Sequence, residues 1–337
     1  HLVSQAFKAD APGAAVLVTQ HGKVLYAAGR GVADRRTHVP LDIDTAFHIG
    51  SVGKQFTALA ALMLVDEGKL ELDAPVGRYL PELADLGDGV TLRRLMGHTA
   101  GIPDVYDALY GATDAEDAAD KGAPRNDDLV HAVDEAVDSP DDLDYKPGTK
   151  WDYSNTGFDI MGAVIEHVSG QSYGAFLQQR IFGPLGMADS FAWDPARKAK
   201  AHRARGYAED GKDWTLVDHD PMDAINGSGS IYTTAADLYR YEQGLRAGTL
   251  LSAASTKAWT TAQKLANGKS TGYGLGLFVW RDDDGPVISH DGLWLGYSAY
   301  MARFPKADAM VVVLSNDADA DPETLGLAIA DRVAAGR

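Results

Sequence analysis

The sequence contains no cysteine among its 337 residues. Disulfide bonds, a cysteine nucleophile and cysteine-ligated zinc are therefore excluded. Basic residues are also scarce, since 31 Lys and Arg stand against 48 Asp and Glu and the formal net charge is −17. Because phosphate binding needs clustered Lys and Arg, nucleic acid is not an expected partner. No apolar segment approaches the roughly 20 residues that a membrane-spanning helix needs, so we expect a soluble protein.

The ten histidines lack the spacing of a metal site. None lies in a His-Glu-x-x-His pattern or in another tight ligand arrangement, so no metal is expected. We expect His48 and His98 to be structural and to bond loop backbone. The chain opens at His1 without the charged and apolar segments of a signal peptide, which leaves export undecided from the residues alone.

Strand-like patterns lie at the two ends of the chain, and helix-like patterns lie in the middle. Two short apolar segments, 14–19 and 24–28, flank Gln20-His21-Gly22-Lys23 and predict a β-hairpin. Further strands, with a turn at Asp284-Gly285, are predicted at 274–280, 287–289, 298–304 and 310–315. Helices are predicted at 51–67, 157–168, 173–182, 234–246 and 324–335.

With 45% hydrophobic residues the chain can bury a large core, in one large domain or in two. Strands from both ends can pair in one antiparallel sheet flanked by helices, with a mainly α-helical domain inserted between them. This is an α/β fold of the α+β type. The expected sheet domain comprises residues 1–50 and 265–337, and the helical domain comprises residues 51–264. The active site is expected at their interface.

One segment, residues 104–144, is strongly acidic. It contains fourteen Asp and Glu against two basic residues, Lys121 and Arg125. A solvated acidic loop or helix face is one explanation. The alternative is a lid beside the site that repels anionic ligands.

Ser51-Val52-Gly53-Lys54 stands shortly before the apolar segment 58–65, which predicts a buried helix. A serine and a lysine three residues apart share one face of a helix, so the amine can reach the hydroxyl. The helix N-terminus offers unpaired N–H groups to an oxyanion and favours a neutral lysine. This is the layout of an activated serine nucleophile. Taken alone, the motif also fits an N-cap serine with a solvated lysine.

Two later motifs supply matching chemistry. Tyr153-Ser154-Asn155 opens a predicted helix, and His290-Asp291-Gly292 follows a short strand. A phenol near a lysine can act as a general base, and an amide can hold a substrate amide through both donor and acceptor. A basic residue on a strand can orient the leaving side of the substrate.

The three motifs, in this order, resemble those of the serine hydrolases that include class C β-lactamases, DD-peptidases, D-aminopeptidases, D-amino-acid amidases and β-lactamase-like esterases. Supporting segments are found along the chain at 47–50, 95–103, 182–187 and 227–234. Several ordered motifs are far more specific than any one of them. The resemblance implies a β-lactamase/transpeptidase-like fold, no metal or cofactor, and a periplasmic or secreted location.

The resemblance also implies the catalytic residues. Ser51 would be acylated, and Lys54 and Tyr153 would share the proton transfers, with the acting base left open. The backbone N–H groups of Ser51 and Leu293 would form the oxyanion hole, so the strand geometry at Gly292 should matter as much as the side chains.

The substrate-binding residues that the resemblance implies are Asn155, His290, Asp291 and Gly292. Asn155 would hold the acyl-side amide of the substrate. Many β-lactamases and DD-peptidases of the family carry Thr or Ser where this chain has Asp291, and that hydroxyl helps to bind the substrate carboxylate. If Asp291 faces the cleft it would repel such a carboxylate. If it points away along the strand it changes little.

We therefore expect a metal-independent serine hydrolase that works through an acyl-enzyme on amides or esters. The expected substrates are peptides or amides with D-configured residues, or small esters. The first alternative is a β-lactamase or a DD-carboxypeptidase, and an alternative of another class is a penicillin-binding sensor that is acylated without turnover. The expected partner is a small-molecule or short-peptide substrate, and the oligomeric state is undecided.

Overall fold

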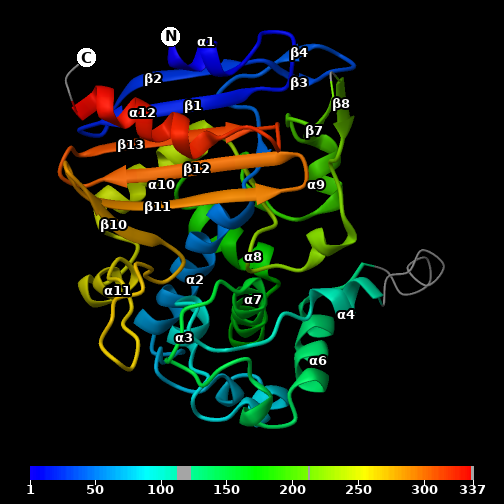
Figure 1. Cartoon of the computed structure of the whole chain (residues 1–337), viewed down its shortest axis with the longest axis vertical. Coiled ribbons are helices and arrows are strands. Elements are labelled where there is room, and N and C mark those ends of the chain that lie inside the picture. The colour runs from blue at the N-terminus through cyan, green and yellow to red at the C-terminus, as the bar shows by residue number, and fades with distance from the viewer. Residues whose placement is uncertain (112–122, 212, 335–337) are drawn as a thin grey trace.

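A six-stranded antiparallel sheet joins the two ends of the chain (Figure 1). The computed structural model describes residues 1–111, 123–211 and 213–334. In spatial order the strands are β10 (Phe278–Asp282), β11 (Gly285–Trp294), β12 (Tyr297–Phe304), β13 (Ala309–Ser315), β1 (Ala14–Gln20) and β2 (Lys23–Arg30). β1 pairs with β13 from Ala14↔Ser315 to Gln20↔Ala309. The sheet assembled from both chain ends is therefore confirmed.

Both faces of this sheet are covered. Val16 and Val313 pack in the cluster that includes α12 (Pro322–Ala334). Leu17 and Val312 face the opposite way and pack in the larger cluster, which includes α2 (Lys54–Asp66) and α10 (Ala235–Ala247). Because both faces of the central strands are buried, their sequences are continuous apolar runs rather than alternating ones.

The hairpin predicted near the N-terminus links β1 and β2. His21 and Gly22 at its turn have φ values of 50° and 71°. Two consecutive residues with positive φ are what a tight hairpin turn of type I′ requires, because this turn matches the twist of the strands.

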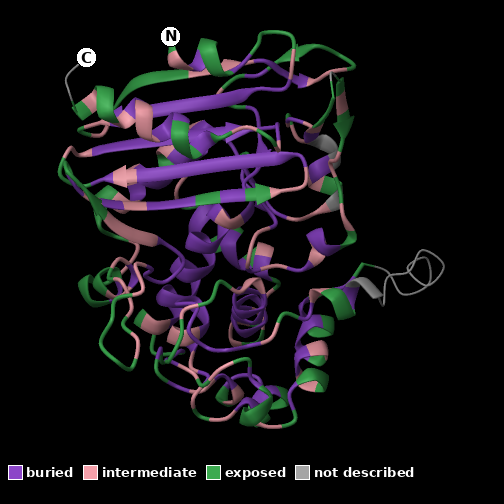
Figure 2. Cartoon of the chain, in the orientation of Figure 1, coloured by how far each residue is buried: buried purple, intermediate pink, exposed green. Residues whose placement is uncertain are grey.

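The helical part of the molecule is built around α2 and α7 (Asn155–Ser169) (Figure 1). Residues 54–64 of α2 are all buried, and both helices are largely buried in Figure 2. A helix enclosed on all sides needs no amphipathic pattern, which explains the continuous apolar run 58–65 in α2. The other helices of the described residues are α1 (Leu2–Ala6), α3 (Leu92–Met96), α4 (Tyr106–Gly111), α6 (Asn126–Ala136), α8 (Tyr173–Leu177), α9 (Pro195–Lys200) and α11 (Ala253–Trp259).

Short elements complete the fold. The small sheets are β3 (Val32–Asp34) with β4 (Val39–Pro40), β5 (Phe47–His48) with β9 (Ile231–Thr233) and β6 (Phe191–Ala192), and β7 (Tyr207–Asp210) with β8 (Asp213–Leu216). Single helical turns are η1 (Gly50–Gly53), η2 (Val76–Arg78), η3 (Pro81–Leu86), η4 (Pro140–Asp142), η5 (Gln178–Phe182) and η6 (Pro221–Ala224). Strands of two to four residues carry too little periodicity to be predicted.

Several predicted boundaries are wrong. The strand predicted at 274–280 begins only at Phe278, because Gly276 has a φ of 75° and the Gly276 N–H bonds the Met96 carbonyl in the helical part. The helix predicted from Ser51 begins at Lys54, after the tighter turn η1. The helix predicted at 173–182 is divided into α8 and η5.

The acidic segment 104–144 lies partly outside the described residues, which omit 112–122. In α6, Leu129 and Val133 are buried while Asp127 and Asp128 are exposed, so this part is a solvated helix face. Within the described ranges no helix is long and apolar enough to cross a membrane. The division into domains at residues 50 and 265 stays a prediction.

Candidate active site

Ser51 lies at the junction between β5 and α2, in the turn η1. Lys54 is the first residue of α2 and is fully buried. Its Nζ lies 3.0 Å from Ser51 Oγ. The tight turn therefore places the amine against the hydroxyl, as the three-residue spacing predicts.

Besides the Ser51 hydroxyl, the Lys54 amine contacts two oxygen atoms that accept its hydrogen bonds. Nζ donates to Asn155 Oδ1 at 2.7 Å and to the Ser228 carbonyl at 2.8 Å. Asn155 begins α7, and Ser228 lies in the loop that leads to β9. Three separate chain segments thus converge on one amine.

Burial lowers the pKa of Lys54 to about 7, and the negative charges of Asp159 and Asp291 partly oppose this shift. At neutral pH a large fraction of the amine is therefore unprotonated. A lysine in this state can accept a proton from a neighbouring hydroxyl.

Tyr153 precedes α7 and lies beside the same serine. Lys54 Nζ lies 4.8 Å from the centroid of the Tyr153 ring, over its face. Burial raises the pKa of the Tyr153 phenol, and a hydrogen bond with Ser51 partly offsets the rise. The ring packs on His98, with centroids 4.3 Å apart, and His98 Nδ1 accepts the Ser154 N–H at 3.2 Å. His98 is thus structural, as expected.

Two glycines allow the turn η1 to lie against strand β11. A methyl group added at Gly292 would lie 2.1 Å from the Ile49 carbonyl oxygen and 3.1 Å from Ser51 N. One added at Gly50 would lie 2.9 Å from Leu293 N. The absence of these side chains brings the Ser51 and Leu293 N–H groups to neighbouring positions, which suits the predicted oxyanion hole.

His290 and Asp291 point to opposite faces of β11. His290 is 1% exposed, and its Nε2 lies 2.8 Å from the Tyr273 hydroxyl and its Nδ1 2.6 Å from the Asp291 carbonyl. Burial lowers the pKa of His290 to about 4, so the ring is neutral and both nitrogens are engaged. The His290 ring therefore links its own strand β11 to Tyr273.

The Asp291 side chain is 59% exposed. Asp291 lies directly opposite Tyr300 on β12. Tyr300 belongs to the cluster that packs on α12, so Asp291 lies on that face and not on the face of His290. The carboxylate is nevertheless close enough to the site for its charge to act on Lys54 and on Tyr153.

Comparison with known proteins agrees with this geometry. The family model described as Beta-lactamase matches residues 2–335. The chain belongs to the β-lactamase family.

This β-lactamase-family protein is 30% identical over 336 residues to Penicillin-binding protein 4* of Bacillus subtilis, over 96% of this chain and 72% of the relative. It is 39% identical over 190 residues to Esterase EstB of Burkholderia gladioli, over 52% of this chain and 46% of the esterase. The solved D-amino acid amidase of Ochrobactrum anthropi SV3, complexed with L-phenylalanine amide, has a TM-score of 0.76 at 24% identity, over 96% of this chain and 92% of the amidase. This last likeness concerns the fold. The protein is a β-lactamase-like serine hydrolase.

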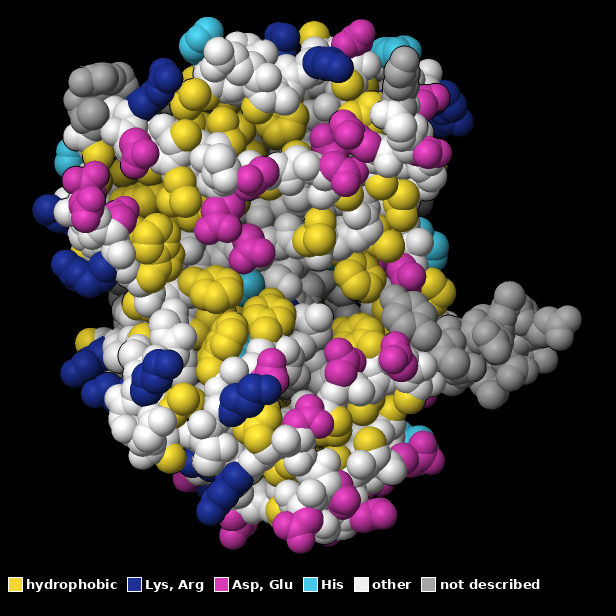
Figure 3. All heavy atoms as spheres, in the orientation of Figure 1, with side chains coloured by type: hydrophobic (Ala, Val, Ile, Leu, Met, Phe, Trp, Pro, Cys, Tyr) yellow, Lys and Arg dark blue, Asp and Glu magenta, His cyan; other side chains and the backbone are white. Residues whose placement is uncertain are grey.

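A cavity of about 40 Å³ adjoins Ser51 in this β-lactamase-family protein. Met222, Ile225 and Trp294 line it beside Ser51, and none of its lining residues in the described part of the chain is Lys or Arg. Trp294 is held in place because its Nε1 donates to Asp223 Oδ1 at 2.6 Å. Figure 3 shows acidic side chains on both sides of the hollow in the middle of the viewed face.

His48 also lines this cavity and supports the turn before Ser51. Its Nδ1 accepts the Gly50 N–H at 3.1 Å, and burial lowers its pKa to about 4. This agrees with the structural role expected for His48.

Three residues of the site were not identified from the sequence: Tyr106, Asp159 and Ser228. Asp159 is fully buried in α7, four residues after Asn155. The Tyr106 hydroxyl donates to Asp159 Oδ2 at 2.6 Å, and the Ser228 N–H donates to Asp159 Oδ1 at 2.7 Å. A carboxylate within the apolar stretch 158–165 was the available signal, because such groups are rarely buried without a specific partner.

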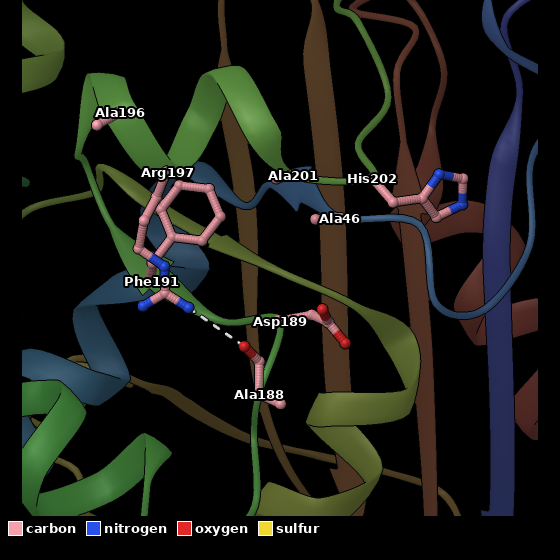
Figure 4. Close-up of a pocket in the computed structure, with 8 residues that line it drawn as sticks. All are labelled: Ala46, Ala188, Asp189, Phe191, Ala196, Arg197, Ala201 and His202. Atoms are coloured by element: carbon pink, nitrogen blue, oxygen red, sulfur yellow. Dashed lines mark hydrogen bonds between the residues drawn. The ribbon is translucent and has the colours of Figure 1, made fainter.

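A larger hollow, of about 260 Å³, lies apart from Ser51 near β6 and α9 (Figure 4). Its lining shares no residue with the cavity at Ser51. Arg197 lies over the Phe191 ring at 5.0 Å and donates to the Ala188 carbonyl at 3.2 Å. Its guanidinium is thus already engaged, and no Ser or Thr of the described residues lines this hollow.

Proposed function

We propose that this serine hydrolase forms an acyl-enzyme on Ser51 with Lys54 as the base. The observation that carries the proposal is the set of contacts of the Lys54 amine. A neutral amine has two N–H donors and one lone pair. Asn155 Oδ1 and the Ser228 carbonyl each accept one N–H. The lone pair is then left for the Ser51 hydroxyl, 3.0 Å away.

In the proposed first half-reaction, Ser51 Oγ forms a bond to the substrate carbonyl carbon while its proton passes to Lys54 Nζ. The carbonyl oxygen becomes an oxyanion beside the N–H groups of Ser51 and Leu293. The bond to the leaving nitrogen or oxygen then breaks. Tyr153, kept protonated by its raised pKa, gives the leaving group a proton and is restored by Lys54.

In the second half-reaction, water attacks the Ser51 ester and Lys54 again accepts the proton, which releases the acid and regenerates the serine. In this proposal Asn155 holds the acyl-side amide of the substrate. The missing side chain of Gly292 leaves room for the substrate beside the strand, and His290 holds that strand in position through the Asp291 carbonyl and the Tyr273 hydroxyl.

The proposed substrates are small amides or esters without a carboxylate next to the scissile bond, including amides of D-configured residues. The cavity at Ser51 is small, and among the residues that the structure describes no Lys or Arg lines it. A substrate carboxylate would lose its hydration there without gaining an ionic partner. The esterase relative supports the ester branch of this proposal.

A second candidate is a β-lactamase or a DD-carboxypeptidase, with or without efficient turnover. It is favoured by the orientation of Asp291, whose side chain lies on the α12 face and leaves the cleft side of the strand free. The penicillin-binding relative supports the same candidate. That relative also supports a periplasmic or secreted location, which fractionation of the source cells would test.

Parallel rate measurements on p-nitrophenyl butyrate, nitrocefin, and D- and L-alanine p-nitroanilides test these proposals. Ser51→Ala serves as the blank, and thermal unfolding verifies its fold. Hydrolysis of the ester or the D-anilide that disappears in Ser51→Ala is expected. Fast loss of nitrocefin would favour the second candidate, and a mass adduct without release would favour a sensor. Unchanged hydrolysis in a folded Ser51→Ala variant would refute the serine mechanism.

A further inference from the structure

We propose that Asp159 is a positioning residue that orients the Lys54 amine through the Ser228 loop and sets the pH at which Ser51 becomes reactive. This inference rests on the proposed function of Lys54 as the base.

Asp159 and Asn155 lie on one face of α7 because they are four residues apart. Asn155 contacts Lys54 directly, whereas the Asp159 carboxylate accepts hydrogen bonds from the Tyr106 hydroxyl and the Ser228 N–H. Asp159 therefore does not contact Lys54 directly but reaches it through Ser228.

Ser228 links the carboxylate to the amine. Its N–H donates to Asp159, and its carbonyl accepts from Lys54. Gly227 has a φ of 140°, and a methyl group there would lie 2.2 Å from the Phe158 carbonyl oxygen, so the loop lies directly on α7. Ser230 also has a positive φ, of 61°. The Asp159 carboxylate holds the Ser228 N–H, and this bond helps to fix where the Ser228 carbonyl points.

The second effect of Asp159 is its charge. The titratable groups around the amine are Asp159 on α7, His290 and Asp291 on β11, His98 after α3, Tyr153 before α7 and Tyr106 on α4. Burial lowers the pKa values of His98 and His290 and raises those of both phenols, so these groups are neutral near pH 7.

The negative charges that act on Lys54 are therefore those of Asp159 and Asp291. Asp291 is largely exposed, so water and salt screen its charge. Asp159 is fully buried, and its field is screened less. Burial raises its own pKa, and its hydrogen bonds with Tyr106 and Ser228 and the Lys54 amine oppose that rise.

The test is the rate at which an alkyl fluorophosphonate labels Ser51, followed by intact mass from pH 5 to 9. Asp159→Asn retains an oxygen acceptor for the Ser228 N–H but removes the charge. In this variant we expect the rise of the labelling rate on the acidic side of the pH profile, its acid limb, to move to lower pH by about one unit. The reason is that the amine loses a charged partner that favours its protonated form. Glu166→Gln, on the same helix, is the matched control and leaves the limb in place.

An acid limb that does not move in Asp159→Asn, with a uniform loss of rate at all pH values, would reduce Asp159 to a structural role and overturn the inference. If Asp159→Asn does not fold, the double variant with Tyr106→Phe removes the facing hydroxyl and is measured in the same way. Failure of the proposed function is distinguishable, because wild-type protein would then not be labelled at Ser51 at all.

Discussion

Replacing Gly292 by alanine tests whether the close contact between β11 and η1 is needed for catalysis. Gly292 does not have a positive φ, so alanine is compatible with its backbone, and the effect comes from packing alone. The added methyl would start 2.1 Å from the Ile49 carbonyl oxygen. To reach 3.0 Å, below which real Cβ contacts essentially never occur, the strand and the turn must separate by about 0.9 Å.

A separation of this size is large compared with the tolerance of an oxyanion hole, whose donors must lie within hydrogen-bond distance of the developing charge. Loss of one such donor costs about 100- to 1000-fold in kcat, or about 3 to 4 kcal/mol. We expect a loss of this size in Gly292→Ala, with Ser51 and Lys54 still present. The Michaelis constant should change less, because the donor acts mainly on the transition state.

The assay is steady-state hydrolysis of p-nitrophenyl butyrate, together with thermal unfolding by circular dichroism. Gly174→Ala is the matched control, because a methyl group there would meet only the Ala192 side chain at 3.4 Å, an ordinary contact. A folded Gly292→Ala variant with kcat within about threefold of wild type would refute the argument that this contact forms the oxyanion hole.

Three further predictions follow from individual groups. Wild-type kcat/KM should rise with pH through about 7, because burial lowers the pKa of Lys54 to about 7 and the neutral amine is the active form; a profile flat from pH 5 to 9 would exclude this base. The free energy of unfolding should decrease as the pH is lowered from 6.5 to 4. The pKa of His48 is about 4 in the folded protein and 6.5 in the unfolded reference, so the unfolded chain binds more protons in this window. In His48→Asn, urea unfolding should depend less on pH over the same window. Trp294→Phe should cost about 1 to 3 kcal/mol of stability, measured by urea unfolding, because it leaves Asp223 without its indole donor; an unchanged midpoint would contradict this.

The sequence by itself determined the fold class and the pairing of Ser51 with Lys54. Continuous apolar strands at both ends predicted the sheet that joins them, and Ser51 and Lys54 are brought together by local turn geometry that their spacing already encodes. Such local and strongly patterned features survive in any tertiary context.

Other boundaries and contacts depended on distant segments. Residues 274–277 look like a strand, yet they leave the sheet because Gly276 bonds Met96 and adopts a positive φ. No pattern within the segment records a partner 180 residues earlier in the chain. The two-residue strand β5, which leads to the turn that carries Ser51, was not predicted either, because its partner β9 lies far away in the sequence.

Only the tertiary structure decided which groups contact one another in the site. The sequence left the direction of Asp291 open, and the pairing of β11 with β12 resolved it by placing Asp291 opposite Tyr300. From the sequence there was no reason to assign Asp159 to the site. Only the folded chain places its carboxylate against the Ser228 N–H, where its charge acts on Lys54. The physical reason is that motif spacing fixes contacts within a turn, whereas charge, burial and pKa depend on groups that are adjacent only after the chain has folded.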